Sequence, residues 1–138
     1  MNRTQLKVML HEGEGRRKKP YKDTVGKLTI GVGRNLDDVG LRDNEIDLML
    51  ENDIDAVEKD LDRALPWWRS MNDRRQLVLA DMCFNLGITK LLKFENTLAA
   101  MRVGNYAKAA EGMKASLWAR QVKGRADKLI KMMEPTNA

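Results

Sequence analysis

The sequence has few of the cysteines and histidines that build disulfides and many metal sites, and it has no long apolar run. It holds one cysteine and one histidine in 138 residues, which excludes an internal disulfide and a multi-cysteine or histidine-rich metal site. Cys83 lies at a helical apolar spacing in LADMCFNLG, which predicts a buried structural thiol rather than a nucleophile. No apolar run is long enough for a membrane helix or for the core of a signal peptide. The chain is therefore expected to carry no export signal of its own.

Acidic residues are outnumbered by basic ones. The chain has 25 Lys and Arg against 20 Asp and Glu, a formal net charge of +5. Such a surface attracts polyanions, and charge alone does not distinguish nucleic acid, acidic lipid or an anionic cell-wall polymer. The alternative is that the charge only confers solubility. A hydrophobic share of 43% with 33% charged residues indicates an ordinary globular domain.

Helical periodicity covers most of the chain. A first helix is expected at 3–12 with Thr4 as its N-cap, and a long one at about 43–65, which Pro66 ends. Later helices are expected within 72–87, 96–105, 106–116 and 124–133. The segment from Tyr21 to Gly33 alternates polar and apolar residues instead, which predicts a small hairpin with its turn near Gly26.

These elements predict an α+β fold in a single domain spanning 1–138. A small N-terminal lobe of about 13–42 would hold the β-hairpin. A connecting helix of about 43–65 would lead to a helical C-terminal lobe of about 66–138, packed with helix 3–12.

The segment GEGRRKKPYKDTVGKLTIGVG, residues 13–33, places two carboxylates and a hydroxyl among glycines. Eight residues separate Glu14 from Asp23, and five separate Asp23 from Thr29. A helix end, a hairpin start and a second strand can bring these side chains to one cleft. The set suits a glycosidase, in which one carboxylic acid protonates the leaving oxygen while the other carboxylate handles a water or the sugar cation.

This segment resembles the phage lysozymes of glycoside hydrolase family 24. Their catalytic signature is a Glu, eight residues, an Asp, five residues and a Thr, in the context EGxRxKPYxD followed by TIGxG. The stretches GVGRNLDDVGL, FNLG, FENTL and LWARQVKGRADKL look like the family pattern too, so the resemblance covers nearly the full chain. It implies a lysozyme-like α+β fold in which Glu14 donates the proton while Asp23 and Thr29 direct the attacking water, with inversion.

Glu12 competes with Glu14 for the role of the acid. It sits in the tripeptide HEG, which family members often have at that position. Glu14 alone keeps the eight-residue gap and aligns the following Arg, Lys, Pro and Tyr without an insertion. Glu14 is therefore the expected acid.

The resemblance also implies residues that bind the substrate or support the site. Arg125 matches an Arg that approaches the catalytic Glu, and at the start of a helix a cation opposes the macrodipole, so Glu14 is its expected partner. The remaining positions border the cleft or pack behind it: Gly33, Leu36, Phe84, Asn85, Gly87 and Trp118. For Phe84 and Trp118 plain core packing is an equal alternative.

One position departs from the pattern of some family members. Arg34 stands where they have a His after the second glycine. A His–carboxylate pair cannot form there, and the pH dependence is expected to differ.

The sequence thus predicts an endolysin, a muramidase that hydrolyses the β-1,4 bond between N-acetylmuramic acid and N-acetylglucosamine in peptidoglycan for host cell lysis. It would act as a monomer, without a cofactor or metal and without membrane insertion. It would stay in the host cytoplasm until a holin-type membrane lesion gives access to the cell wall in the periplasm.

Two rival functions remain open. A lytic transglycosylase cuts the same bond without water, but such enzymes often lack a catalytic Asp, so Asp23 and Thr29 favour hydrolysis. A small basic nucleic-acid-binding protein is suggested by GRRKK at 15–19, although no recognisable reading helix or stacking aromatics accompany this run.

Overall fold

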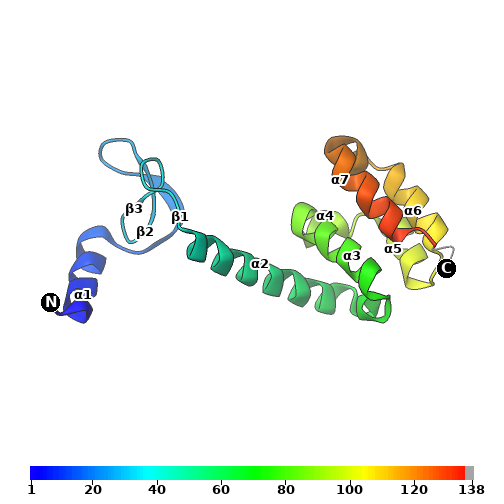
Figure 1. Cartoon of the computed structure of the whole chain (residues 1–138), viewed down its shortest axis with the longest axis horizontal. Coiled ribbons are helices and arrows are strands. Elements are labelled where there is room, and N and C mark those ends of the chain that lie inside the picture. Colours follow the sequence, from blue (N-terminus) through cyan, green and yellow to red (C-terminus); the bar gives the residue numbers. More distant parts are fainter. Residues whose placement is uncertain (136–138) are drawn as a thin grey trace. The chain divides into compact units, whose positions relative to one another are not determined.

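The computed structural model describes residues 1–135, which divide after Met49 into an N-terminal and a C-terminal unit. The N-terminal unit holds α1 (Arg3–Glu14), β1 (Arg17–Lys22), β2 (Leu28–Gly31), β3 (Arg34–Asn35) and the start of α2 (Asp43–Ala64) (Figure 1). The C-terminal unit holds the rest of α2, a 3₁₀ turn η1 (Pro66–Ser70), α3 (Asp73–Leu86), α4 (Ile88–Leu91), α5 (Glu95–Arg102), α6 (Tyr106–Lys114) and α7 (Leu117–Met133). The predicted α+β class is confirmed.

Helix α1 begins and ends differently from the prediction. Its N-cap is Asn2, whose side chain accepts from the backbone N–H of Gln5 at 2.9 Å, so the expected cap Thr4 was wrong; Asn is among the strongest N-caps. The helix runs to Glu14 and ends at Gly15, with φ 75°. None of its side chains is buried, and its packing on the C-terminal lobe stays a prediction.

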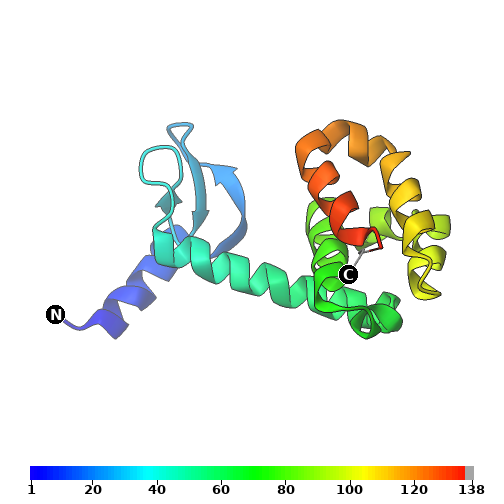
Figure 2. The ribbon, with the colours of Figure 1, turned by 45° about the vertical axis from the view of Figure 1, so that its right-hand side comes forward.

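The hairpin is confirmed and belongs to a three-stranded antiparallel sheet of order β1-β2-β3 (Figure 2). Thr29 on β2 pairs with Tyr21 on β1 and with Asn35 on β3. Strand β1 begins at Arg17, earlier than expected, and its register shifts between Arg17 and Tyr21. Pro20 lies in that shifted stretch. A proline has no N–H to donate, and a bulge or an edge strand tolerates such a residue.

The C-terminal unit carries the hydrophobic core. Helix pairs α5 and α6, α6 and α7, and α3 and α7 pack on one another. The fully or nearly fully buried apolar side chains come from α2, η1 and each later helix, and include Leu61, Trp68, Val78, Leu79, Met82, Leu91, Met101, Met113, Ala126 and Met133. Cys83 is buried among them, and burial raises the pKa of its thiol, as does the charge of Asp60. The predicted structural thiol is confirmed.

The last helix is longer than predicted. It begins at Leu117 behind the N-cap Ser116 and is kinked at Lys123, so the predicted start at 124 coincides with the kink. At its end the guanidinium of Arg75, on α3, donates to the carbonyls of Met133 and Glu134 at 2.9 Å each. These bonds tie the end of α7 to α3. No helix within residues 1–135 has the length and apolar character to cross a membrane.

Candidate active site

The carboxyl of Glu14 lies against the backbone of Gly33. Glu14 is the last residue of α1, and Gly33 has φ 70°. A Cβ built on Gly33 would lie 2.9 Å from Cγ, Cδ and Oε2 of Glu14, closer than atoms can pack. The two residues that the sequence placed at one cleft are therefore in contact. Glu12 lies two residues earlier on the same helix, about 200° around its axis, and so points away from this contact.

Asp23 is held by the turn that it opens. Its Oδ1 accepts from the backbone N–H groups of Val25 at 2.9 Å and Lys27 at 2.8 Å. The Asp23 N–H in turn donates to the carbonyl of Lys27 at 2.9 Å. Both side-chain bonds go to Oδ1, so the carboxylate has a fixed orientation and Oδ2 is left to meet a water or a ligand. The turn role that Asp so often has is present here.

Thr29 is 3% exposed and is the only buried residue in the fully described segment 1–49. Its position in the middle strand of the sheet explains this burial. Its hydroxyl donates to the carbonyl of Lys27 at 2.9 Å. Because a hydroxyl has one hydrogen, Thr29 can only accept from a further partner. A water beside it would donate to Thr29 rather than receive from it.

The loop after Gly33 is held by an ion pair that sequence reasoning missed. Arg34 Nη1 donates to Glu45 Oε1 at 2.7 Å and to the carbonyl of Gly40 at 3.2 Å. The same carboxylate oxygen accepts from the N–H of Arg42 at 2.8 Å. The bond from Arg34, and then that from Arg42, lower the pKa of Glu45 to about 2. The sequence signal that could have predicted the bond to Arg42 is a Glu three residues after it, which is the spacing of a capping box at a helix start.

Leu36 extends the same loop beyond β3. Its N–H donates to the carbonyl of Leu28 at 2.7 Å, and its side chain is half-buried. Leu36 thus lies in the same unit as Glu14, Asp23, Thr29 and Gly33, and its place at the cleft stays a prediction.

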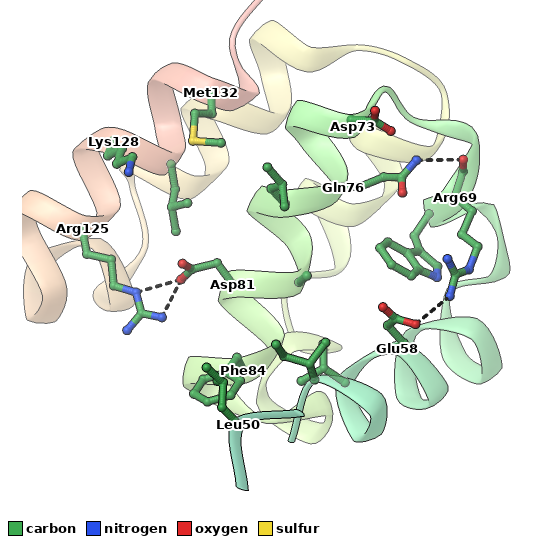
Figure 3. A pocket seen from close by; sticks show the side chains of 16 residues that line it. Leu50, Glu58, Arg69, Asp73, Gln76, Asp81, Phe84, Arg125, Lys128 and Met132 are labelled. Carbon is green, nitrogen blue, oxygen red and sulfur yellow. Dashed lines mark hydrogen bonds and ion pairs between the residues drawn. The ribbon is translucent and has the colours of Figure 1, made fainter. Parts of the chain in front are cut away.

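Arg125 has an acidic partner within the C-terminal unit. Its Nε and Nη2 approach Oδ1 of Asp81 at 2.7 and 2.6 Å (Figure 3). The expected partner was Glu14, and that pairing stays a prediction. Asp81 was missed because it comes from α3, 44 positions earlier in the chain. The signal for it is a lone carboxylate within the apolar stretch LVLADMCF.

Phe84 and Arg125 share a groove of about 760 Å³ in the C-terminal unit. Its walls are mostly apolar, with the pairs Asp81–Arg125 and Glu58–Arg69 beside them (Figure 3). The apolar lining residues are Leu50, Ile54, Val57, Trp68, Leu77, Ala80, Phe84, Leu129 and Met132. Phe84 is 46% exposed, so core packing does not account for it, and its ring is free for contact.

Trp118 borders a second groove of about 720 Å³ but is itself buried, with 3% exposed. Core packing is the correct alternative for this residue, because its ring packs edge-on against Phe94 and offers no open face to a sugar. Its indole N–H donates to Oδ1 of Asn85 at 3.0 Å. The amide nitrogen of the exposed Asn85 therefore remains to donate elsewhere. Gly87 ends α3 with φ 80° and donates to the carbonyl of Cys83, which is a capping role.

The N-terminal unit offers two carboxyl groups, one of them fixed by backbone hydrogen bonds, and a hydroxyl that can accept a hydrogen bond. Within residues 1–135 no three or more His, Cys, Asp or Glu side chains gather in a set that would hold a metal ion. The basic run at 15–19 is partly taken into β1, where the guanidinium of Arg17 lies 4.8 Å from the ring centre of Tyr21.

The profile of the family described as phage lysozyme matches residues 11–132. The chain is 30% identical to the pre-baseplate central spike protein Gp5 of Enterobacteria phage T4, over 88% of this chain and 26% of the spike protein. It is 25% identical to the probable T4-type lysozymes 1 and 2 of Dictyostelium discoideum, over 94% of this chain and 93% of each of them. The chain thus spans about a quarter of the spike protein and nearly the whole of the two probable lysozymes.

Proposed function

Because this chain belongs to the phage lysozyme family, and is therefore a glycosidase of the lysozyme type, we propose that it is a muramidase. Its reaction is hydrolysis of the β-1,4 bond between N-acetylmuramic acid and N-acetylglucosamine in peptidoglycan. The observation that carries the proposal is the arrangement of the N-terminal unit, where the Glu14 carboxyl rests on Gly33 and the Asp23 carboxylate is fixed by two N–H groups.

In the proposed reaction Glu14 donates its proton to the glycosidic oxygen as the bond breaks. Asp23 accepts a proton from a water held with Thr29, and that water attacks the anomeric carbon from the opposite side, with inversion. The geometry supports these roles, because Oδ2 of Asp23 and a lone pair of Thr29 are both acceptors and a water can donate to both.

Residues of the C-terminal unit are proposed to bind the sugar chain. Asn85, oriented by Trp118, would donate its amide N–H to the substrate, and the exposed Phe84 would offer an apolar contact. Arg125, which is paired with Asp81, is proposed to bind the substrate as well.

The first test is loss of turbidity of Gram-negative cells stripped of their outer membrane. Glu14→Gln is expected to abolish lysis, and the matched variant Glu12→Gln to retain it, with both thermal transitions unchanged. If Glu12→Gln is inactive instead, Glu12 is the catalytic acid. If the parent protein does not lyse the cells, the muramidase proposal is wrong.

Product analysis separates hydrolysis from transglycosylation. A reducible muramic end is expected, and an anhydro end would instead favour the lytic transglycosylase. Proton NMR of the first product formed is expected to show the α-anomer, because inversion of a β-linkage yields it. A first product of β-configuration would show that the reaction proceeds with retention, and the proposed hydrolysis itself would stand.

The biological role proposed is that of an endolysin in host cell lysis. The protein would be made in the host cytoplasm and act as a monomer on the wall in the periplasm, after a holin-type lesion opens the membrane. A gel-shift assay at physiological salt tests the nucleic-acid alternative, and tight saturable binding would revive it.

A further inference from the structure

We propose that Gly33 is a positioning residue whose bare Cα forms the seat for the Glu14 carboxyl, and that the Arg34–Glu45 pair fixes this seat. The inference rests on the proposed function, because Glu14 is the acid of that reaction. It assigns to Gly33 a steric role toward the acid instead of a role toward the sugar.

The contact itself leaves no room for a side chain. Three atoms of Glu14, Cγ, Cδ and Oε2, would each lie 2.9 Å from a Cβ on Gly33. Glu14 is at the end of α1, and its side chain has rotatable bonds, so the carboxyl would give way rather than the sheet. A methyl group at position 33 therefore displaces the group that must reach the glycosidic oxygen.

Gly31 supplies a matched comparison two residues earlier. Its φ is 67° against 70° for Gly33, so a side chain meets the same backbone restriction at both positions. A Cβ on Gly31 would meet nothing within 4 Å. The two alanine substitutions therefore face a similar backbone restriction, but only the one at position 33 would meet Glu14.

The segment after Gly33 is held at several points, so the seat is not free to move aside. Arg34 is bound to Glu45 and to the carbonyl of Gly40. The amide of Asn35 donates to Asp38 at 3.0 Å, while the Asp38 N–H donates back to Oδ1 of Asn35 at 2.9 Å. Position 33 is therefore fixed by β3 and by the start of α2 together.

The expected result of a shifted acid is a slower chemical step. A misplacement of about 1 Å can lower the rate about 100-fold. Because Glu14 protonates the leaving oxygen in the transition state, the loss falls on kcat, and KM stays within about 2-fold of the parent.

The experiment compares parent, Gly33→Ala and Gly31→Ala on soluble, uncross-linked peptidoglycan strands. We expect Gly33→Ala to lower kcat about 100-fold and Gly31→Ala to leave it near the parent value, with equal thermal transitions for the two variants. The carboxyl ¹³C resonance of Glu14, observed by NMR at fixed pH, should move in Gly33→Ala and stay in place in Gly31→Ala. Glu45→Gln, which adds no atom at the seat, should lower kcat by a smaller factor at unchanged KM.

Equal kcat values for the two alanine variants would overturn the proposal that Gly33 positions Glu14. An unmoved Glu14 resonance in Gly33→Ala would overturn it too. If Gly33→Ala does not fold, an unchanged kcat and an unmoved Glu14 resonance in Glu45→Gln overturn the proposal. An inactive parent would count against the muramidase reaction alone, because the NMR comparison still decides whether Gly33 positions Glu14.

Discussion

Asp23 has a structural role in its turn and a proposed catalytic role, and two substitutions can separate them. Its Oδ1 accepts both backbone N–H bonds of the turn, and the amide oxygen of Asn can accept the same bonds. Asp23→Asn therefore keeps the turn and removes the charge. We expect activity on peptidoglycan to fall by about 100- to 10,000-fold, while the free energy of unfolding in urea changes by less than about 0.5 kcal/mol.

Asp23→Ala is the matched variant for the structural role. It loses the charge and both hydrogen bonds, so it should be as inactive as Asp23→Asn and also less stable by about 1–2 kcal/mol. Retention of more than a tenth of the activity by a folded Asp23→Asn variant would contradict the role of this carboxylate.

The sequence, through its family resemblance, predicted candidate catalytic residues, but it did not predict the contacts that hold them in place. Glu14, Asp23 and Thr29 were predicted from the spacing and the family resemblance of one short segment. All three lie in the N-terminal unit, and their catalytic roles stay a prediction. The seat on Gly33 and the Asp81–Arg125 pair join positions far apart in the chain. Such contacts depend on tertiary packing, which local periodicity does not describe.

At the scale of elements, the long periodic segments and the hairpin were predicted, and two of the shortest elements were missed. The helix predicted at about 43–65 is α2, Asp43–Ala64. Strand β3 has two residues and α4 has four, too few for a pattern to show. Trp118 lies before the kink of α7, in the half of that helix that was left unassigned.

The Arg34–Glu45 pair joins the loop after β3 to the first turn of α2, and its contribution to stability depends on pH. Its bonds lower the pKa of Glu45 from the ordinary 4.5 to about 2. A lowered carboxyl pKa stabilises the folded state fully above the unfolded value, and this stability is lost as pH falls through the folded value. The side chains of the pair are 28% and 32% exposed, so solvent screening keeps the effect modest.

We therefore expect Glu45→Gln to lower the thermal midpoint most near pH 6–7, and the gap to the parent to narrow between about pH 4.5 and about 2. Calorimetric scans across this range check it. Arg34→Gln is the control, since removal of the partner should produce a gap that closes over the same range. If the difference in thermal midpoint between Glu45→Gln and the parent is constant from pH 7 to pH 2, the pair does not cause the pH dependence of stability.

Charge is unequally distributed over the whole molecule. Helix α2 carries nine of the 20 acidic residues and only two basic ones, Lys59 and Arg63. The rest of the chain therefore holds 23 basic residues against 11 acidic ones. The net charge of +5 understates how basic the surface outside α2 is, and that surface is what a polyanion would meet.

The stem peptides of peptidoglycan carry carboxylates, so the proposed encounter with the wall should weaken with salt. Between 0.1 and 1 M NaCl the screening length falls from about 10 Å to about 3 Å. We expect the initial rate on isolated cell walls to fall at least about 10-fold over this range. The kcat on soluble glycan strands of N-acetylmuramic acid and N-acetylglucosamine whose carboxyl groups have been amidated should change less than about 2-fold, because that neutral substrate has no charge to screen. The neutral substrate also reports any effect of salt on the Arg34–Glu45 pair inside the molecule.

A rate on cell walls that is independent of salt would show that the basic surface has no part in reaching the substrate. Equal losses of rate on both substrates would show that salt acts on the folded protein itself.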